Sequence, residues 1–69
     1  MRLAYFAETD TLSIQLLDAL SAETEALSDH VTIDRDKTGE IIAIDIEHAS
    51  KHVDLSSLHA SSVPFTATA

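Results

Sequence analysis

The twelve residues from Asp34 to Asp45 come nearest, in type and spacing, to a metal-binding motif. Oxygen donors occupy the first, third, fifth and last positions, and glycine occupies the sixth. A calcium loop with this spacing lies between two helices. Here the flanking segments 31–33 and 41–46 are rich in β-branched residues, which favour strands. The pattern therefore favours a turn, and a divalent-metal site that uses Asp34, Asp36 and Asp45 is the alternative.

Two of the four histidines, His48 and His52, stand four residues apart. On a helix they would share one face, as metal ligands do, and Glu47 or His59 would complete a set. Two imidazoles by themselves bind metals weakly and unselectively. Solvated histidines are therefore the preferred interpretation, the His48/His52 pair is an alternative metal site, and no cofactor is predicted.

The residues on which most enzymes rely are missing or isolated. The chain has no cysteine and one glycine, so it offers neither a thiolate nucleophile nor a glycine-rich phosphate loop. Its serines lack the flanking glycines of a nucleophile elbow. We therefore expect no catalytic residues and a protein that is not an enzyme.

Alternating apolar residues predict two β-hairpins. Residues 2–6 and 11–17 form the first, joined by the polar turn 7–10. Residues 31–35 and 40–47 form the second, joined by Asp36-Lys37-Thr38-Gly39. In that turn Gly39 supplies the positive φ of a type I turn with a bulge, and Asp36 can accept hydrogen bonds from amides two or three residues ahead.

The segment between the hairpins is open to two interpretations. Residues 18–28 are rich in Ala, Leu and Glu, which favours a helix, but a short third strand at 22–27 is equally compatible. After residue 47 the β-branched pattern stops, and residues 48–53 predict a short helix. Asp54 is then typical of a second N-cap, after which Leu55 and Leu58 would dock on the sheet.

These elements predict an α+β fold with a small antiparallel sheet, built from two hairpins and a short middle strand in meander-like order, and a short C-terminal helix. One domain is expected at residues 1–60, and residues 61–69 are expected to be a disordered tail. Because a chain of 69 residues has a marginal core and no cysteine for a disulfide or a thiolate zinc site, we expect a homo-oligomer, most simply a dimer.

Four Lys and Arg residues against twelve Asp and Glu residues give a formal net charge of −8. This charge repels phosphate backbones and anionic lipids, so no nucleic-acid or membrane partner is expected. It would speed the encounter with a basic protein partner and make that binding salt-sensitive, although an acidic surface more often serves solubility. The early carboxylate at Glu8 and the lack of any apolar run of about 18 residues predict neither a signal sequence nor a membrane span. The absence of cysteine is compatible with the cytoplasm, where we expect the protein.

A larger set of residues, in this order, is similar to a known family. The set comprises Tyr5, Glu8, Asp10, Leu12, Ile14 and Leu16, then Ala22-Glu23-Thr24-Glu25, then Val31, Ile33, Asp34, Asp36, Gly39, Ile42, Ile44 and Ile46, and finally Ala49-Ser50-Lys51. Over about residues 2 to 52 the chain resembles the small bacterial proteins grouped as domain of unknown function 2283. It departs from their pattern at Phe6 and Ala7, where Asp-Pro is usual, and at Ala43, which is often Gly.

The resemblance implies a compact antiparallel sheet with a short C-terminal helix, a strand at 22–27, and no established activity. Some members are associated with gene neighbourhoods that hold small toxin-like proteins, which would suit an acidic chain that neutralises a basic partner. With the size and charge of the chain, this predicts a non-enzymatic protein-interaction module, antitoxin-like toward a basic partner. The alternative is a small protein that binds a divalent metal.

Overall fold

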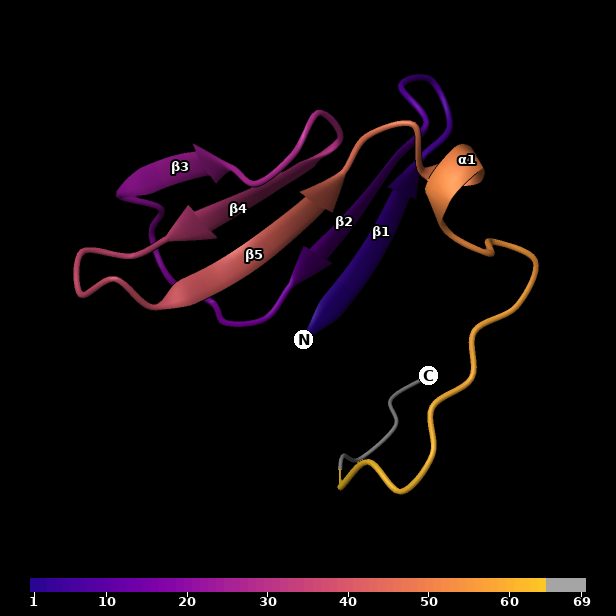
Figure 1. The fold of residues 1–69 in the computed structure, drawn as a ribbon. Coiled ribbons are helices and arrows are strands. Elements are labelled where there is room, and N and C mark those ends of the chain that lie inside the picture. The colour runs from indigo at the N-terminus through magenta and orange to yellow at the C-terminus, as the bar shows by residue number, and fades with distance from the viewer. Residues whose placement is uncertain (65–69) are drawn as a thin grey trace.

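A computed structural model describes residues 1–64 and shows a five-stranded antiparallel sheet with one short helix (Figure 1). The elements in chain order are β1 (Arg2–Phe6), β2 (Thr11–Gln15), β3 (Glu23–Ala26), β4 (Val31–Arg35), β5 (Ile41–Ile46) and α1 (Ala49–His52). The predicted α+β fold class, with both hairpins and a short C-terminal helix, is confirmed. Each hairpin forms between neighbouring strands with alternating side chains, as the sequence pattern requires.

The order of the strands, β1-β2-β5-β4-β3, departs from the expected meander-like order. β5 is the central strand because it pairs with β2 on one side and with β4 on the other. The connection from β2 to β3 therefore crosses to the far edge of the sheet. Leu16 and Leu17 donate their amides to the Ile42 carbonyl at 2.8 and 3.2 Å, and Ala22 donates to the Arg35 carbonyl at 2.8 Å. These bonds hold the connection against the end of the sheet.

The middle segment is a strand and not a helix. β3 covers residues 23–26, pairs with β4, and forms one edge of the sheet. On one side of this pair the Thr24 hydroxyl donates to the Asp34 carboxylate at 2.6 Å. On the other side Arg35 donates to the Glu25 carboxylate at 3.3 Å. Tertiary pairing thus outweighs the helix propensity of Ala and Glu in this segment.

The register sorts the side chains onto two faces. Strands β1, β2, β5 and β4 contribute one row of Tyr5, Leu12, Ile46 and Val31, and a second row of Leu3, Ile14, Ile44 and Ile33. Together with Ile42, these nine residues are called the apolar face. The alternate positions carry mainly small and polar side chains, among them Ala4, Ser13, Asp45, Thr32 and Asp34. We call that side of the sheet the polar face.

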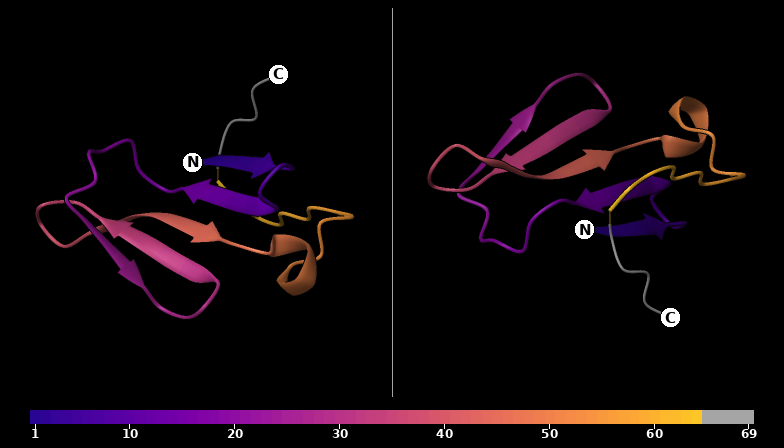
Figure 2. Two further views of the ribbon diagram at one scale, coloured as in Figure 1. Left: turned by 90° about the horizontal axis from the view of Figure 1, so that it is seen from above. Right: turned by 90° about the horizontal axis from the view of Figure 1, so that it is seen from below.

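The fully buried core is small. It consists of Ile33, Ile42 and Ala49, which are 3%, 2% and 0% exposed. Views along the sheet show that α1 lies beside one end of it and does not cross either face (Figure 2). Within residues 1–64, a single layer of strands therefore supplies nearly all of the packing, although a sheet with one apolar face usually has a second layer upon it.

The expected second helical turn after α1 is wrong. The Asp54 carboxylate accepts hydrogen bonds from the Ser56 amide at 3.0 Å and the Ser56 hydroxyl at 2.5 Å, but no helix follows. Leu58 is 78% exposed and does not dock on the sheet. A single turn rich in serine does not repay the cost of helix nucleation without an apolar surface to cover.

Beyond residue 60 the chain continues without a helix or strand as far as residue 64. The remainder of the predicted tail, residues 65–69, lies outside the described residues. None of the helices in the described part has the length and apolar character needed to cross a membrane.

The central position of Ile42 generates a prediction about stability. Replacing Ile42 by Ala should lower the free energy of unfolding by about 2–5 kcal/mol, because it leaves a cavity beneath β5. This is a large share of the stability of a small domain. Ile41→Ala is the matched control, since Ile41 is only half-buried and should cost clearly less. Urea unfolding followed by far-UV circular dichroism measures both, and equal losses would contradict the assignment of Ile42 to the core.

Candidate functional site

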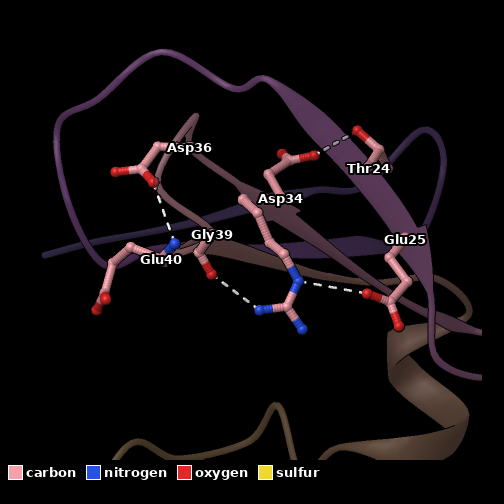
Figure 3. Close-up of polar contacts among 7 residues, drawn as sticks. Thr24, Glu25, Asp34, Asp36, Gly39 and Glu40 are labelled. Carbon is pink, nitrogen blue, oxygen red and sulfur yellow. Dashed lines mark hydrogen bonds and ion pairs between the residues drawn. The ribbon is translucent and has the colours of Figure 1, made fainter.

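The β4–β5 turn is built around the side chain of Asp36 (Figure 3). One carboxylate oxygen, Oδ1, accepts hydrogen bonds from the Thr38 hydroxyl at 2.6 Å, the Thr38 amide at 2.9 Å and the Glu40 amide at 3.1 Å. Gly39 has a φ of 89°, as the predicted turn requires. These donors, led by the Thr38 hydroxyl, hold the pKa of Asp36 below its ordinary value. The carboxylate therefore closes the turn.

The three carboxylates of the calcium-loop alternative do not converge on one point. Asp36 is engaged in the turn, Asp34 accepts from Thr24 on the neighbouring strand, and Asp45 lies within β5 opposite Thr32. The second half of the twelve-residue segment is itself strand β5. A loop that wraps a cation cannot form while these residues stay paired in the hairpin.

The two histidines of the other metal alternative do not both belong to the helix. His48 has a left-handed backbone, with a φ of 52°, and stands at the N-cap of α1, so it lies outside the helix that contains His52. Across residues 1–64 no three histidine or carboxylate side chains gather closely enough to hold a metal ion. Metal binding stays a prediction that this arrangement does not support.

A cluster around Asp10 attaches the helix to the first hairpin. The Asp10 carboxylate accepts hydrogen bonds from the Tyr5 hydroxyl at 2.7 Å, the Ser50 hydroxyl at 2.7 Å and the Ser50 amide at 3.1 Å. The Asp10 carbonyl accepts from the Ala49 amide at 2.8 Å. Asp10 thereby takes the place of an N-cap residue for a helix 40 positions further along the chain. The resulting position leaves Ala49 fully buried.

The same contacts shift two pKa values in opposite directions. Hydrogen bonds from the Ser50 hydroxyl, then the Tyr5 hydroxyl, hold the pKa of Asp10 below its ordinary value. The pKa of Tyr5 is raised, chiefly because its hydroxyl donates to Asp10. The charged form of Asp10 and the neutral form of Tyr5 are therefore the forms that the fold stabilises.

The spacing of residues does not reveal this cluster, because Tyr5 and Asp10 stand far from Ser50 in the sequence. A signal was nevertheless present. All three residues belong to the set that carried the family resemblance, and the structure now assigns them a shared physical role. That role is to fix α1 on the β1–β2 turn.

A stacked pair of histidines makes the second attachment of α1. The rings of His30 and His52 lie nearly parallel, 9° apart, with their centroids 3.6 Å from each other. His30 belongs to the β3–β4 connection, where the Ser28 hydroxyl accepts from the amides of His30 and Val31 at 3.3 and 3.1 Å. His30 also accepts from the Glu47 amide at 2.7 Å through its carbonyl. Two turns and the helix thus meet at one end of the sheet.

The surface of the described residues offers open grooves and no buried charged side chain. One shallow groove of about 390 Å³ lies between Leu3, Tyr5 and Leu12 of the sheet and the segment 53–58. Its walls are mainly aliphatic. Such a surface can contact another protein. The shifted pKa values at its lining, raised for Tyr5 and lowered for Asp54, arise chiefly from hydrogen bonds to Asp10 and Ser56.

The Asp10 cluster generates a prediction about pH. Because the pKa of Asp10 in the fold is lower than its ordinary value of 3.8, its charge stabilises the fold above about pH 4. This contribution is lost as the pH falls through the lowered pKa. Asp10→Asn should therefore unfold several degrees below the wild type at neutral pH, and the difference should shrink in acid.

Thermal unfolding followed by circular dichroism between about pH 7 and pH 2.5 measures this difference. Asp18→Asn is a suitable control, because Asp18 is exposed on the β2–β3 connection and has no hydrogen-bond partner within the described residues. A difference between wild type and Asp10→Asn that stays constant down to the lowest pH would contradict the proposed role of the Asp10 charge.

Comparison with known proteins places this arrangement in a family. No curated protein and no solved structure gives a match. A family described as protein of unknown function, DUF2283, matches residues 2–50. The matched range runs from the first strand to Ser50, so it contains the whole sheet and the Asp10 cluster. Since the match covers well over half of the sequence, the chain belongs to the DUF2283 family of proteins of unknown function.

Proposed function

We propose that this protein is a non-enzymatic protein-interaction module, and that its acidic surface binds a basic protein partner in the manner of an antitoxin. The observation that carries the proposal is the charge balance of the folded chain. Twelve carboxylates stand against four cationic side chains, and the ion pair between Arg35 and Glu25 is the only one within residues 1–64. Most of the negative charge is therefore unneutralised and faces solvent.

On the four strands β1, β2, β4 and β5, the carboxylates all lie on one side of the sheet. Asp34 and Asp45 lie on the polar face, on the adjacent strands β4 and β5, among hydroxyl and small side chains. Others lie in the turns around the sheet, including Glu8, Glu40 and Glu47. The apolar face has none on its four strands. A basic protein that approaches the polar face would meet charge at the centre and at the rim.

The character of the described surface supports a binding role. The grooves of the described residues are open, no charged side chain is buried, and the shifted pKa values of Asp10, Asp36 and Asp54 all arise from local hydrogen bonds that close turns or hold the helix. Catalytic acids and bases are usually found where burial and neighbouring charges act together in a cleft. These three carboxylates serve the fold.

The test is affinity capture from a lysate of cells that express the protein, followed by mass spectrometry, at low and at high NaCl. We expect a basic protein to be recovered at low salt and lost at high salt, because salt screens the attraction between exposed charges. Asp45→Lys reverses one charge at the centre of the polar face and should weaken binding of that protein at least about tenfold.

Glu23→Lys is the matched control, since it changes the net charge by the same amount but lies on β3, at the margin of the opposite face. It should affect binding much less. The proposal fails if the recovered proteins are not basic, if their recovery does not depend on salt, or if both substitutions weaken binding equally. Relief of growth arrest on co-expression with the captured protein would test the antitoxin role itself.

A further inference from the structure

The apolar face is only partly covered in the single chain, because Ile33 and Ile42 are buried but its other seven residues are not. Leu3 and Tyr5, at the β1 side, are 46% and 45% exposed, and the central residues Ile14, Ile44 and Ile46 are only half-buried. Segment 53–58 extends the apolar surface beside β1, where Leu55 is 40% exposed. In stable domains such a face packs against a second layer. Residues 1–64 contain no such layer.

The accessible surface of the chain is larger than that of a compact monomer of the same mass. A compact monomer of 7.5 kDa exposes about 4,200 Å². This chain exposes 5511 Å², which is roughly 1,300 Å² more. Its radius of gyration is 13.1 Å, against about 11 Å for a compact chain of this length. A standard interface buries about 800 Å² on each partner. This excess is larger than the area that one partner buries in a standard interface, and the extended segment 53–64 contributes to it.

The distribution of charge indicates what the face can bind. Its two complete rows across β1, β2, β5 and β4 contain no charged side chain. Charge appears only at the β3 and β4 margin, as Glu23 and the Glu25–Arg35 ion pair. A basic protein gains nothing from the centre of such a face. An equally apolar surface fits it, and the chain itself carries one.

We propose that a second copy of this chain covers the apolar face, in a twofold-symmetric dimer whose two sheets pack against each other. A twofold axis brings the same patch of each protomer into contact, so a self-complementary surface is sufficient. Two sheets packed in this way lie about 10 Å apart with interdigitating side chains. The dimer turns the half-buried rows into the core of a two-layer sandwich.

The charges at the β3 and β4 margin place the twofold axis away from that margin, at the middle of the four apolar strands. The axis runs between β2 and β5, so that β1 of one protomer covers β4 of the other. Strand β3, with Glu23 and Glu25, then lies at the solvated rim. The polar faces of both protomers point outward and stay free for another partner. Because each protomer carries a net charge of −8, added salt should strengthen the dimer by screening their repulsion.

The test measures the solution mass of the full chain by sedimentation velocity over a range of protein and salt concentrations. We expect twice the monomer mass of 7.5 kDa, with tighter association at higher salt. Leu3→Lys should raise the dissociation constant at least about tenfold, because it places a charge within the apolar contact. This substitution lowers the net negative charge, so increased repulsion cannot explain a loss of the dimer.

Ala4→Lys is the matched control, because Ala4 is the exposed neighbour on the same strand and lies on the polar face. It should leave the dimer intact. A wild-type monomer at high protein concentration overturns the proposal. A dimer that survives Leu3→Lys, or that Ala4→Lys weakens equally, also overturns it, because association would then use a sheet edge or another surface.

Tyr5 provides a second measurement that needs no substitution. It is the only tyrosine in a chain without tryptophan, and it lies on the apolar face. Acrylamide quenching of its fluorescence should fall by about half or more on going from dilute to concentrated protein, since the partner would cover its exposed 45%. If the solution mass rises with protein concentration but the quenching does not change, the proposal is overturned. This result does not depend on whether Leu3→Lys folds.

Discussion

The backbone pairing of β5 with both β2 and β4 sets the register on which every other feature of this protein depends. Because side chains alternate along a strand, this register puts Ile42, Ile44 and Ile46 on the same side as the apolar residues of the neighbouring strands. A slip by one residue would exchange the two faces completely. The Asp36 turn, which fixes β5 relative to β4, therefore determines the surfaces of the whole molecule.

The second organising feature is the end of the sheet where three connections meet. Helix α1 has only four residues and could not persist alone in water. It is held instead by the Asp10 carboxylate, which supplies the missing cap, and by the ring of His30, which stacks on His52. In return the helix buries Ala49. A very short element is thus made stable by polar contacts from residues far away in the sequence.

The fold separates two kinds of surface that respond oppositely to salt. Apolar side chains occupy one face, while the carboxylates lie on the other face, in the turns and along the β3 margin. Screening weakens attraction between the acidic surface and a basic protein, and it also weakens repulsion between two copies of the chain. A dimer and a basic partner can therefore coexist, because they would use opposite sides of the same sheet.

Local sequence patterns are sufficient to predict the two hairpins, the Asp36 turn and the negative charge of the chain. Alternation of β-branched residues and the Asp36–Gly39 turn are local properties, so β1, β2, β4 and β5 follow from residues that are neighbours in the chain. The strand at Glu23–Ala26 was not determined in this way, because its own composition also favours a helix, and only the ladder with β4 decides between the two.

The strand order and the position of α1 depend on long-range contacts. The same contacts keep the candidate metal-ligating residues apart. No local pattern shows that β5 returns to pair with β2, or that Asp10 reaches Ser50 across 40 residues. The spacing of Asp34, Asp36 and Asp45 suits a metal loop only while the chain is free to wrap around an ion. Pairing in the hairpin removes that freedom, since a strand holds alternate side chains apart on a flat surface.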